Sequence, residues 1–215
     1  MHTLEVTLCF RVHSAVHVTG EHAQLWTDKV LVRDWHGARH PVVPATTLKG
    51  WLREAAERAL RSLGAAACDG SSAGTICGGC PVCQVFGAPR RRSPLRFADA
   101  VLRDATTDVK MHVSLSRYRR TAYEERLFSL ETAWQQTFTA QIRGLFPDTA
   151  HVEQAATLLW LGARMGYAIG AGRSRGLGWV HVEKFRACVD GQELMPEKLA
   201  QALRGLAQQK TEVSS

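Results

Sequence analysis

Four cysteines that lie close together constrain the fold of this chain more than any other feature. They are Cys68, Cys77, Cys80 and Cys83, and the last three form two consecutive C-x-x-C steps that share Cys80. Four clustered thiolates satisfy a tetrahedral Zn²⁺ ion. A redox site is the first alternative, but such sites carry one C-x-x-C pair at a helix start, and a reducing compartment disfavours disulfides. The pattern therefore favours a structural zinc knuckle with no open coordination position for catalysis.

The composition is that of an ordinary globular protein. The chain has 215 residues, of which 45% are hydrophobic and 22% are charged, and this balance is too apolar for a disordered polymer. The first residues, MHTLEVTLCFRVHS, lack the basic and continuous apolar regions of a signal peptide, and no apolar stretch is long enough to span a bilayer. We therefore expect a cytoplasmic protein without a membrane partner.

The positive charge is concentrated in three places. The formal net charge is +7, and basic clusters occur at residues 89–92 (PRRR), 117–120 (RYRR) and 172–176 (GRSRG). A basic run is often only a solvated surface. Because each cluster stands beside glycine or an aromatic residue, however, the distribution favours a nucleic-acid partner.

Hydrophobic periodicity predicts an α+β fold. Residues 4–12 alternate as a half-buried strand, and residues 46–63 have the apolar stripe of a helix. Strands are predicted over 95–102, 137–143 and 179–185, a second long helix opens at 147–149, and a short helix starts at Pro196. The order strand, helix, strand, strand, helix, strand is the ferredoxin-like βαββαβ arrangement shared with RNA-recognition modules. We expect one domain over residues 1–208, with insertions at 65–94 (the zinc loop) and 103–130 (a projecting loop or hairpin), and a disordered tail at 209–215.

Local signals mark the ends of the first helix. Thr46 or Thr47 is the predicted N-cap, and Gly64 fits the position just after the C-terminus. Glu57 and Arg61 are spaced as an i,i+4 ion pair.

A glycine-rich stretch precedes the last predicted strand. Residues 166–180 read GYAIGAGRSRGLGWV. Glycines allow positive φ and a close backbone approach to a ligand, and arginines offer forked donors to phosphate. A dinucleotide fingerprint would lie between the first strand and the first helix, whereas this stretch follows the second helix. The candidate RNA-binding residues here are Gly170, Gly172, Gly176, Gly178, Arg173 and Arg175.

Four motifs together resemble a known family. IGAGRSRGLGWV resembles the C-terminal glycine-rich motif of the RAMP superfamily, the RNA-binding subunits of CRISPR effector complexes, and VPATTLKGWLREAAE resembles that superfamily's entry into the first helix. CPVCQVFG followed by LRFADA resembles the zinc knuckle of the backbone subunit of type III complexes, and VSLSRYRRTAYEERLFSLETA is similar to its RNA-facing thumb. The motifs stand in the family's order and cover most of the chain.

The resemblance implies a subunit that polymerises along a guide RNA with other copies of itself and other effector subunits. Its thumb would displace bases of a paired single-stranded target RNA, and an aspartate would cut the target at these regular intervals with Mg²⁺ or Mn²⁺. The family's loop matches DKVLVRD in this chain, so Asp28 falls on the catalytic position and Asp34 is the second choice. The remaining RNA contacts that we expect are Lys49, Arg53, Arg117, Arg119 and Arg120.

Three other functions remain open at this point. The chain can be a scaffold that holds guide RNA while Asp28 is inert, or a zinc-stabilised RNA-binding protein outside CRISPR. It can also be a metal-independent, guide-processing ribonuclease of the same superfamily, since paired histidines cleave RNA by general acid–base catalysis. The candidate histidines are His13, His17, His22, His36 and His40.

Overall fold

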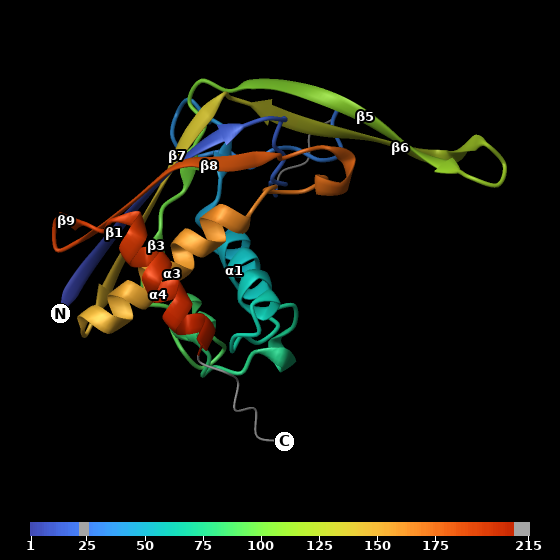
Figure 1. Ribbon diagram of the computed structural model, residues 1–215. Coiled ribbons are helices and arrows are strands. Elements are labelled where there is room, and N and C mark those ends of the chain that lie inside the picture. The colour runs from blue at the N-terminus through green and yellow to red at the C-terminus, as the bar shows by residue number, and fades with distance from the viewer. Residues whose placement is uncertain (22–25, 209–215) are drawn as a thin grey trace.

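The computed structural model describes residues 1–21 and 26–208. Within these residues the largest element is a five-stranded antiparallel sheet with the order β3-β7-β1-β8-β9. Helices cover one face of this sheet, and a long two-stranded hairpin extends away from it (Figure 1). The α+β class predicted from the sequence is confirmed.

Strand β1 (His2–Val12) lies at the centre of the sheet, between β7 (Thr137–Phe146) and β8 (Val180–Val189). Alternate residues of β1 and β7 are buried, as their alternating patterns predicted. Phe10 stacks on Phe138 of the neighbouring strand with ring centroids 4.5 Å apart. The apolar face of the sheet is therefore fixed by three long strands from distant parts of the sequence.

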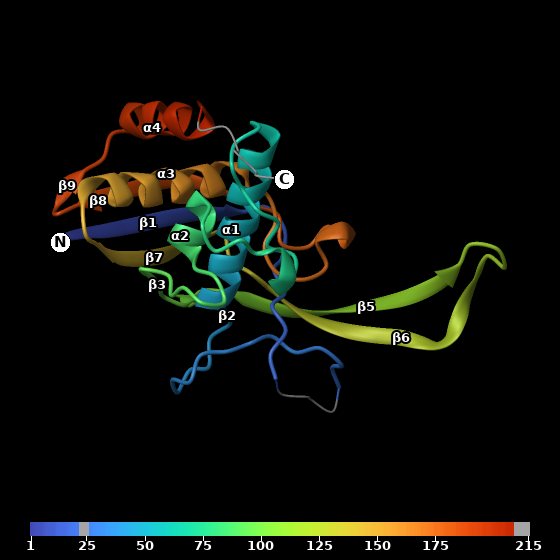
Figure 2. The same cartoon turned by 90° about the horizontal axis from the view of Figure 1, so that it is seen from below.

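Two helices pack against this buried face. Helix α1 (Ala45–Ser62) crosses α3 (Thr149–Met165), and α4 (Pro196–Gln208) lies on the outer side of α3 (Figure 2). The remaining short elements are β2 (Val42–Val43), η1 (Ala73–Thr75), α2 (Pro81–Phe86), β3 (Leu95–Phe97), β4 (Ala100–Val101), η2 (Arg173–Arg175) and β9 (Gln192–Glu193).

The two ends of α1 are capped differently from each other. Gly64 follows the helix at φ +71°, and Ala65 N–H donates to the carbonyl of Leu60, so the predicted glycine stop is confirmed. The predicted threonine cap is wrong. Ala45 N–H instead donates to the carboxylate of Asp99 at 2.7 Å.

The same aspartate explains why the predicted strand over 95–102 is not continuous. Residues 95–97 pair with β7, whereas residues 100–101 pair with β2 in a separate two-stranded sheet. Asp99 lies between these two short strands, and its carboxylate accepts a hydrogen bond from the first residue of α1. A tertiary contact has therefore divided a pattern that locally favours one strand.

The segment predicted as a projecting loop or hairpin is a hairpin. Strands β5 (Thr106–Ser116) and β6 (Thr121–Trp134) pair with each other and form a sheet of their own. The hairpin leaves the body at one end of the main sheet, and its tip stands clear of every other labelled element (Figures 1 and 2). We call residues 106–134 the hairpin.

Two expectations concern segments at the margins of this description. The predicted disordered tail at 209–215 lies outside the described residues. None of the helices within the described residues is both long enough and apolar enough to cross a membrane.

Candidate nucleic-acid interface and metal site

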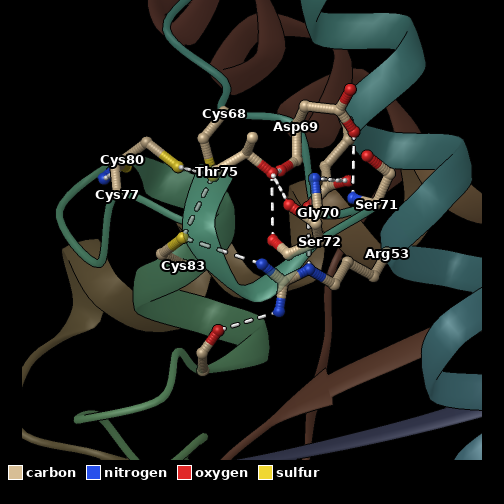
Figure 3. Close-up of polar contacts among 12 residues, drawn as sticks. Arg53, Cys68, Asp69, Gly70, Ser71, Ser72, Thr75, Cys77, Cys80 and Cys83 are labelled. Atoms are coloured by element: carbon tan, nitrogen blue, oxygen red, sulfur yellow. Dashed lines mark hydrogen bonds and ion pairs between the residues drawn. The ribbon is translucent and has the colours of Figure 1, made fainter.

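The four clustered cysteines converge at one point. Their Sγ atoms all lie within 4.8 Å of one another, and the Sγ atom of Cys68 is 3.3 Å from that of Cys83 and 3.6 Å from that of Cys80. Tetrahedral coordination with metal–sulfur bonds of about 2.3 Å requires sulfur atoms roughly 4 Å apart. The cluster, shown in Figure 3, could therefore bind a metal such as zinc.

Local sequence builds this arrangement. Helix α2 begins at Pro81, directly after Cys80, and this places the buried Cys83 on its first turn. Gly78 has a φ of +76°, which allows the chain to turn back between Cys77 and Cys80. Burial raises the pKa of the Cys77 thiol, but hydrogen bonds from neighbouring backbone N–H groups outweigh it and bring the pKa down to about 7. Burial instead raises the pKa of the Cys80 and Cys83 thiols, so Cys77 is more readily converted than these two to the thiolate that binds metal.

Arg53 connects the metal loop to α1. Its guanidinium donates to the Glu57 carboxylate at 2.7 Å, to the Gly87 carbonyl at 2.9 Å and to the Cys83 Sγ at 3.7 Å (Figure 3). Glu57 in turn accepts from the backbone N–H of Gly70. Glu57 therefore pairs with Arg53, and the predicted Glu57–Arg61 pair is wrong.

Burial explains this choice of partner. Glu57 is buried, and its side chain faces the cysteine loop (residues 65–94), where Arg53 also lies. Arg61 instead reaches the exposed Asp69 at 3.4 Å. Of the residues expected to contact RNA, Arg53 thus already has three intramolecular acceptors.

A basic groove lies between α1 and the end of the cysteine loop. The hollow has a volume of about 810 Å³, and Lys49 contributes to it from α1. Reciprocal hydrogen bonds between Ala88 and Arg91 close a tight turn that presents the arginines. Burial and the nearby Arg53 lower the pKa of Lys49. Among the described residues the lining contains no carboxylate; it comprises Lys49, Arg53, Ile76, Phe86, Gly87, Ala88, Pro89, Arg90, Arg91, Arg92, Ser93 and Leu95.

The candidate catalytic residue Asp28 lies at the base of the hairpin. Its Oδ2 atom accepts from the backbone N–H of Ser129 at 2.7 Å and from the Ser129 hydroxyl at 2.8 Å. The N–H of Asp28 donates back to the Ser129 hydroxyl oxygen at 2.9 Å. These hydrogen bonds from Ser129 lower the pKa of the exposed Asp28 carboxyl, which is consequently ionised at neutral pH.

The second aspartate of the loop has a different environment. Asp34 is half-buried, and its Oδ1 atom has no hydrogen-bond partner among the described residues. Between the two aspartates, the buried Glu131 of β6 accepts from Leu31 N–H and forms an ion pair with Arg33. Strand β6 therefore fastens the segment between Asp28 and Asp34 at two points.

Positive charge gathers around an aromatic ring beside Asp28. Phe128 stacks on its cross-strand partner His112, with ring centroids 5.2 Å apart. The Nζ atom of Lys29 lies 5.8 Å from the Phe128 centroid, and the Cζ atom of Arg175 lies 5.3 Å from it. The Phe128 ring of the hairpin thus contacts two other segments, the Asp28 loop (residues 28–34) and the glycine-rich loop (residues 166–178).

Two glycines of the glycine-rich loop are required by close packing. Gly170 and Gly178 have φ values of +85° and +74°. A Cβ atom at Gly170 would stand 2.3 Å from the His17 carbonyl oxygen, and one at Gly178 would stand 2.0 Å from the Ile169 carbonyl oxygen. Such distances exclude any side chain, so these glycines hold the loop against its neighbours.

The remaining candidate contacts in this loop are on its surface. Gly172 and Gly176 flank η2 with φ values of +74° and +81°. Arg175 points to Phe128, whereas Arg173 is 3.2 Å from the Glu54 carboxylate of α1. The two arginines therefore have different partners, although only one residue separates them.

The basic cluster at the hairpin tip is distant from these sites. Arg117, Arg119 and Arg120 are exposed in the turn between β5 and β6. Arg175 of the glycine-rich loop lies against Phe128, partway along the hairpin, whereas the tip arginines lie in the turn at its far end (Figures 1 and 2). The structure therefore brings Lys29 and Arg175 together around Phe128, one residue from the Ser129 that holds Asp28, and the tip arginines lie outside this group.

The candidate histidines do not form a cluster among themselves. His17 is buried, and its ring nitrogens contact the Glu131 carbonyl and the Thr19 hydroxyl. The Nε2 atom of His13 lies 2.6 Å from Nδ1 of His181, which the sequence did not indicate as a partner. His36 is exposed and His40 half-buried, and His22 lies outside the described residues.

Sequence reasoning missed the β6 residues that organise the Asp28 loop. These are Phe128, Ser129 and Glu131. Ser129 and Glu131 are polar residues two positions apart in a strand whose base is buried, which indicates a shared polar face with partners. This signal could be recognised only if the segment was assigned to a strand.

Comparisons with known proteins identify the family. The model of the RAMP superfamily matches residues 31–181. No curated protein matches the sequence. Among solved structures, the chain is similar to one in the cryo-EM structure of the Type III-B Cmr-beta bound to cognate target RNA. The TM-score is 0.57 at 16% identity over 86% of this chain, and the match spans 60% of the length of that neighbour. The chain belongs to the RAMP superfamily.

Proposed function

We propose that this chain is a guide-RNA-binding backbone subunit of a type III CRISPR ribonucleoprotein, and that it cleaves guide-paired target RNA at regular intervals. The observation that carries this proposal is the position of Asp28. This exposed, ionised carboxylate is fastened to Ser129 of β6, one residue from the Phe128 ring on which Lys29 and Arg175 lie. Membership of the RAMP superfamily and the likeness to a chain of a Type III-B Cmr complex support the proposal that the chain is a type III subunit.

The fold supports an RNA-binding role. The sheet order β3-β7-β1-β8, with α1 and α3 on one face, has the strand order of a ferredoxin-like core. In this interpretation residues 1–208 are one domain, and the cysteine loop and the hairpin are its two insertions. The hairpin acts as the thumb, whose tip arginines Arg117, Arg119 and Arg120 contact RNA at a distance from the body.

Two cationic surfaces are available for a polyanion. The basic groove presents Lys49 beside three consecutive arginines, and desolvation of Lys49 favours the approach of an anion that stabilises its charge. The glycine-rich loop offers Arg173 and Arg175 to phosphate oxygens. Guide RNA spans these surfaces, while the single-stranded target pairs with the guide.

Asp28 is suited to act on a displaced nucleotide. Once a nucleotide is unstacked, its 2′-oxygen can attack the adjacent phosphorus and the bond to the 5′-oxygen breaks, which leaves a 2′,3′-cyclic phosphate and a 5′-hydroxyl. The 2′-hydroxyl loses a proton and the 5′-oxygen gains one. Because its pKa is lowered, Asp28 is a weak base and is better suited to orient the 2′-hydroxyl or to hold a cation. Lys29 and Arg175 lie where they can neutralise phosphate charge.

The residues fit a structural zinc ion better than they fit a catalytic Mg²⁺ or Mn²⁺ ion. The four thiols fit structural Zn²⁺ in number, donor type and spacing. A single carboxylate such as Asp28 binds Mg²⁺ or Mn²⁺ weakly, so RNA phosphates and water must provide the other ligands. A divalent cation bound there would supply Lewis-acid stabilisation of the phosphate charge.

The decisive experiment is cleavage of a guide-complementary RNA by the assembled complex, with Mg²⁺ or with EDTA. Wild type is compared with Asp28→Ala and with Asp34→Ala. We expect regularly spaced products that disappear with EDTA and with Asp28→Ala, with a rate loss of about 100-fold or more, and that persist with Asp34→Ala. Tight target binding without cleavage would leave the chain as a scaffold, and spaced products from Asp28→Ala would move the active carboxylate elsewhere.

A second candidate function has one observation in its favour. His13 and His181 form an exposed pair with ring nitrogens 2.6 Å apart, which could provide the acid and base of a metal-independent guide-processing ribonuclease. Such cleavage would persist in EDTA and would disappear with His181→Ala. The two functions are therefore distinguished by the same chelator experiment.

A further inference from the structure

We propose that Ser129 is the positioning residue of the Asp28 carboxylate, so that the hairpin itself aligns the group that acts on RNA. This inference rests on the proposed function, and it extends that function to a residue 101 positions away in the chain. Its structural basis is a three-bond contact between the loop and strand β6.

The contact fixes both the position and the rotation of the carboxylate. The backbone N–H and the hydroxyl of Ser129 both donate to Oδ2 of Asp28, at 2.7 and 2.8 Å. The Asp28 N–H donates to the same hydroxyl oxygen at 2.9 Å. With one carboxylate oxygen held from two directions, the side chain is kept in one orientation, because a change of rotamer would break charge-assisted hydrogen bonds.

The second carboxylate oxygen is the one left for chemistry. Within the described part of the chain, Oδ1 of Asp28 takes part in none of the three bonds to Ser129, and the residue is exposed. In this proposal Oδ2 anchors the group, and Oδ1 is left for an RNA ligand. A preorganised ligand loses less entropy when it binds than a freely rotating one does.

Ser129 itself is held rigidly enough to act as an anchor. It is buried, with 5% of its surface exposed, and it lies opposite Met111 in the β5–β6 ladder. The backbone of β6 from Ser129 onward also pairs with the loop, since Lys29 N–H donates to the Ser129 carbonyl and Glu131 N–H donates to the Lys29 carbonyl. These main-chain bonds would keep the loop beside β6 if the hydroxyl were removed, so the hydroxyl acts on the carboxylate specifically.

Three variants separate positioning from folding. Ser129→Ala removes the hydroxyl, Ser129→Thr keeps it, and Ser114→Ala is the matched control, a half-buried serine of β5 whose side chain makes no hydrogen bond within the described residues. We expect Ser129→Ala to slow target cleavage by the assembled complex about tenfold, which corresponds to one charge-assisted hydrogen bond. Guide-RNA affinity should stay unchanged, and Ser129→Thr and Ser114→Ala should cleave at close to the wild-type rate.

A second measurement does not depend on cleavage. The melting temperatures of wild type, Asp28→Ala, Ser129→Ala and the double variant form a thermodynamic cycle in the full chain. If the two side chains interact, the double variant loses less stability than the two single losses added together. Additive losses would overturn the inferred contact.

The outcomes also separate this inference from the proposed function. If Asp28→Ala abolishes cleavage while Ser129→Ala matches wild type, the positioning role is wrong and the nuclease assignment stands. If Ser129→Ala weakens guide-RNA binding by the same factor as cleavage, Ser129 has only a structural role. If Asp28→Ala leaves the spaced products intact, the nuclease assignment fails and the positioning role fails with it.

Discussion

In the one-domain arrangement that we propose, the cysteine loop and the hairpin are both insertions into the same core, but they are stabilised in opposite ways. The cysteine loop contains little regular structure, and four thiols and the Arg53–Glu57 pair converge at its centre. The hairpin has a main-chain ladder between β5 and β6, which an irregularity interrupts between Val113 and Leu115, and it exposes apolar side chains such as Met111 and Leu115 along its length. We therefore predict that the cysteine loop depends on a metal cross-link, whereas the hairpin is held by its own ladder and by its contacts with the body.

This difference explains where each insertion can carry function. Ladder hydrogen bonds keep β6 extended, so its polar residues at the base present a fixed surface to the Asp28 loop. The cysteine loop carries its charges at its exit, where Arg90, Arg91 and Arg92 line the basic groove. The function that we propose therefore places the reaction chemistry at the hairpin base and anion binding at the cysteine loop, and four perturbations test this contrast.

The largest effect on stability is expected from removing the buried metal ligand. We predict that purified protein contains one Zn²⁺ per chain and that Cys83→Ser releases it. The free energy of unfolding should fall by about 3–5 kcal/mol, which lowers the melting temperature by roughly 10 °C. Elemental analysis and thermal denaturation measure this. Cys9→Ser, outside the cluster, is the control and should retain the metal.

Chemical release of zinc also tests whether the cysteine loop and the hairpin are independent of each other. Mercurial release of zinc should loosen the cysteine loop without abolishing target cleavage, because Asp28 is attached to the hairpin and not to the cysteine loop. Zinc-free protein with freely titrating thiols and unchanged stability would show that the cysteines are not a metal site.

The next effect concerns the base of the hairpin. Glu131→Ala removes the acceptor of Leu31 N–H and leaves Arg33, whose side chain is 25% exposed, without its partner. We expect a loss of about 2–4 kcal/mol in the free energy of unfolding, less than for a fully buried pair because Arg33 is partly solvated. Chemical denaturation with metal retained measures it. A loss of zinc in this variant would contradict the independence of the two insertions.

A smaller effect is expected on RNA binding. Arg175→Ala and Arg90→Ala each remove one cation, from the glycine-rich loop and the basic groove respectively. Each should weaken guide-RNA binding by about 1 kcal/mol and reduce the salt dependence of the affinity by roughly one ion. Filter binding across a salt series measures both, and Arg143→Ala, at an exposed position of β7 in the main sheet, is the control. If only one variant changes the slope, only that surface contacts RNA.

The smallest effect is a pH dependence at the hairpin base. Burial lowers the pKa of His17 below its ordinary value of 6.5, more than its hydrogen bond to the Glu131 carbonyl raises it. The unfolded chain therefore binds a proton at a higher pH than the folded chain does, so stability is complete above about pH 6.5 and falls as the pH drops toward the folded pKa.

Amide hydrogen exchange at Ala133, whose N–H donates to the Val16 carbonyl, reports the loss of stability near His17. Exchange protection should decrease between about pH 6.5 and pH 5 in wild type. The decrease should be weaker in His17→Gln, which carries no titrating group. An equal decrease in both proteins would assign the pH dependence to other groups.

Much of the scaffold followed from local patterns. The alternation of residues 4–12 and 137–143 predicted β1 and β7 and their buried faces, and Gly64 predicted the end of α1. The spacing of the cysteines predicted their convergence. These features depend on short-range periodicity or on chelate geometry, which a sequence displays directly.

The errors have a common cause. Asp99 caps α1 from a distant segment and lies in the break of a predicted strand. Glu57 pairs with Arg53 because both side chains face the cysteine loop. The cap and the ion pair both depend on which surfaces meet after folding. Propensity and spacing do not carry that information, because a cap or an ion pair requires only proximity in space.

The sequence by itself determined the α+β class, the cysteine cluster and the basic stretches, and its resemblance to the RAMP superfamily made Asp28 a candidate. Tertiary structure alone decided that Asp28 lies against Ser129, that Arg175 and Lys29 lie on Phe128, and that the tip arginines stand apart. The physical reason is range. Periodic burial and ligand spacing act over a few residues, whereas a hydrogen bond between residues 28 and 129 exists only once the hairpin and the loop have been brought together by the rest of the fold.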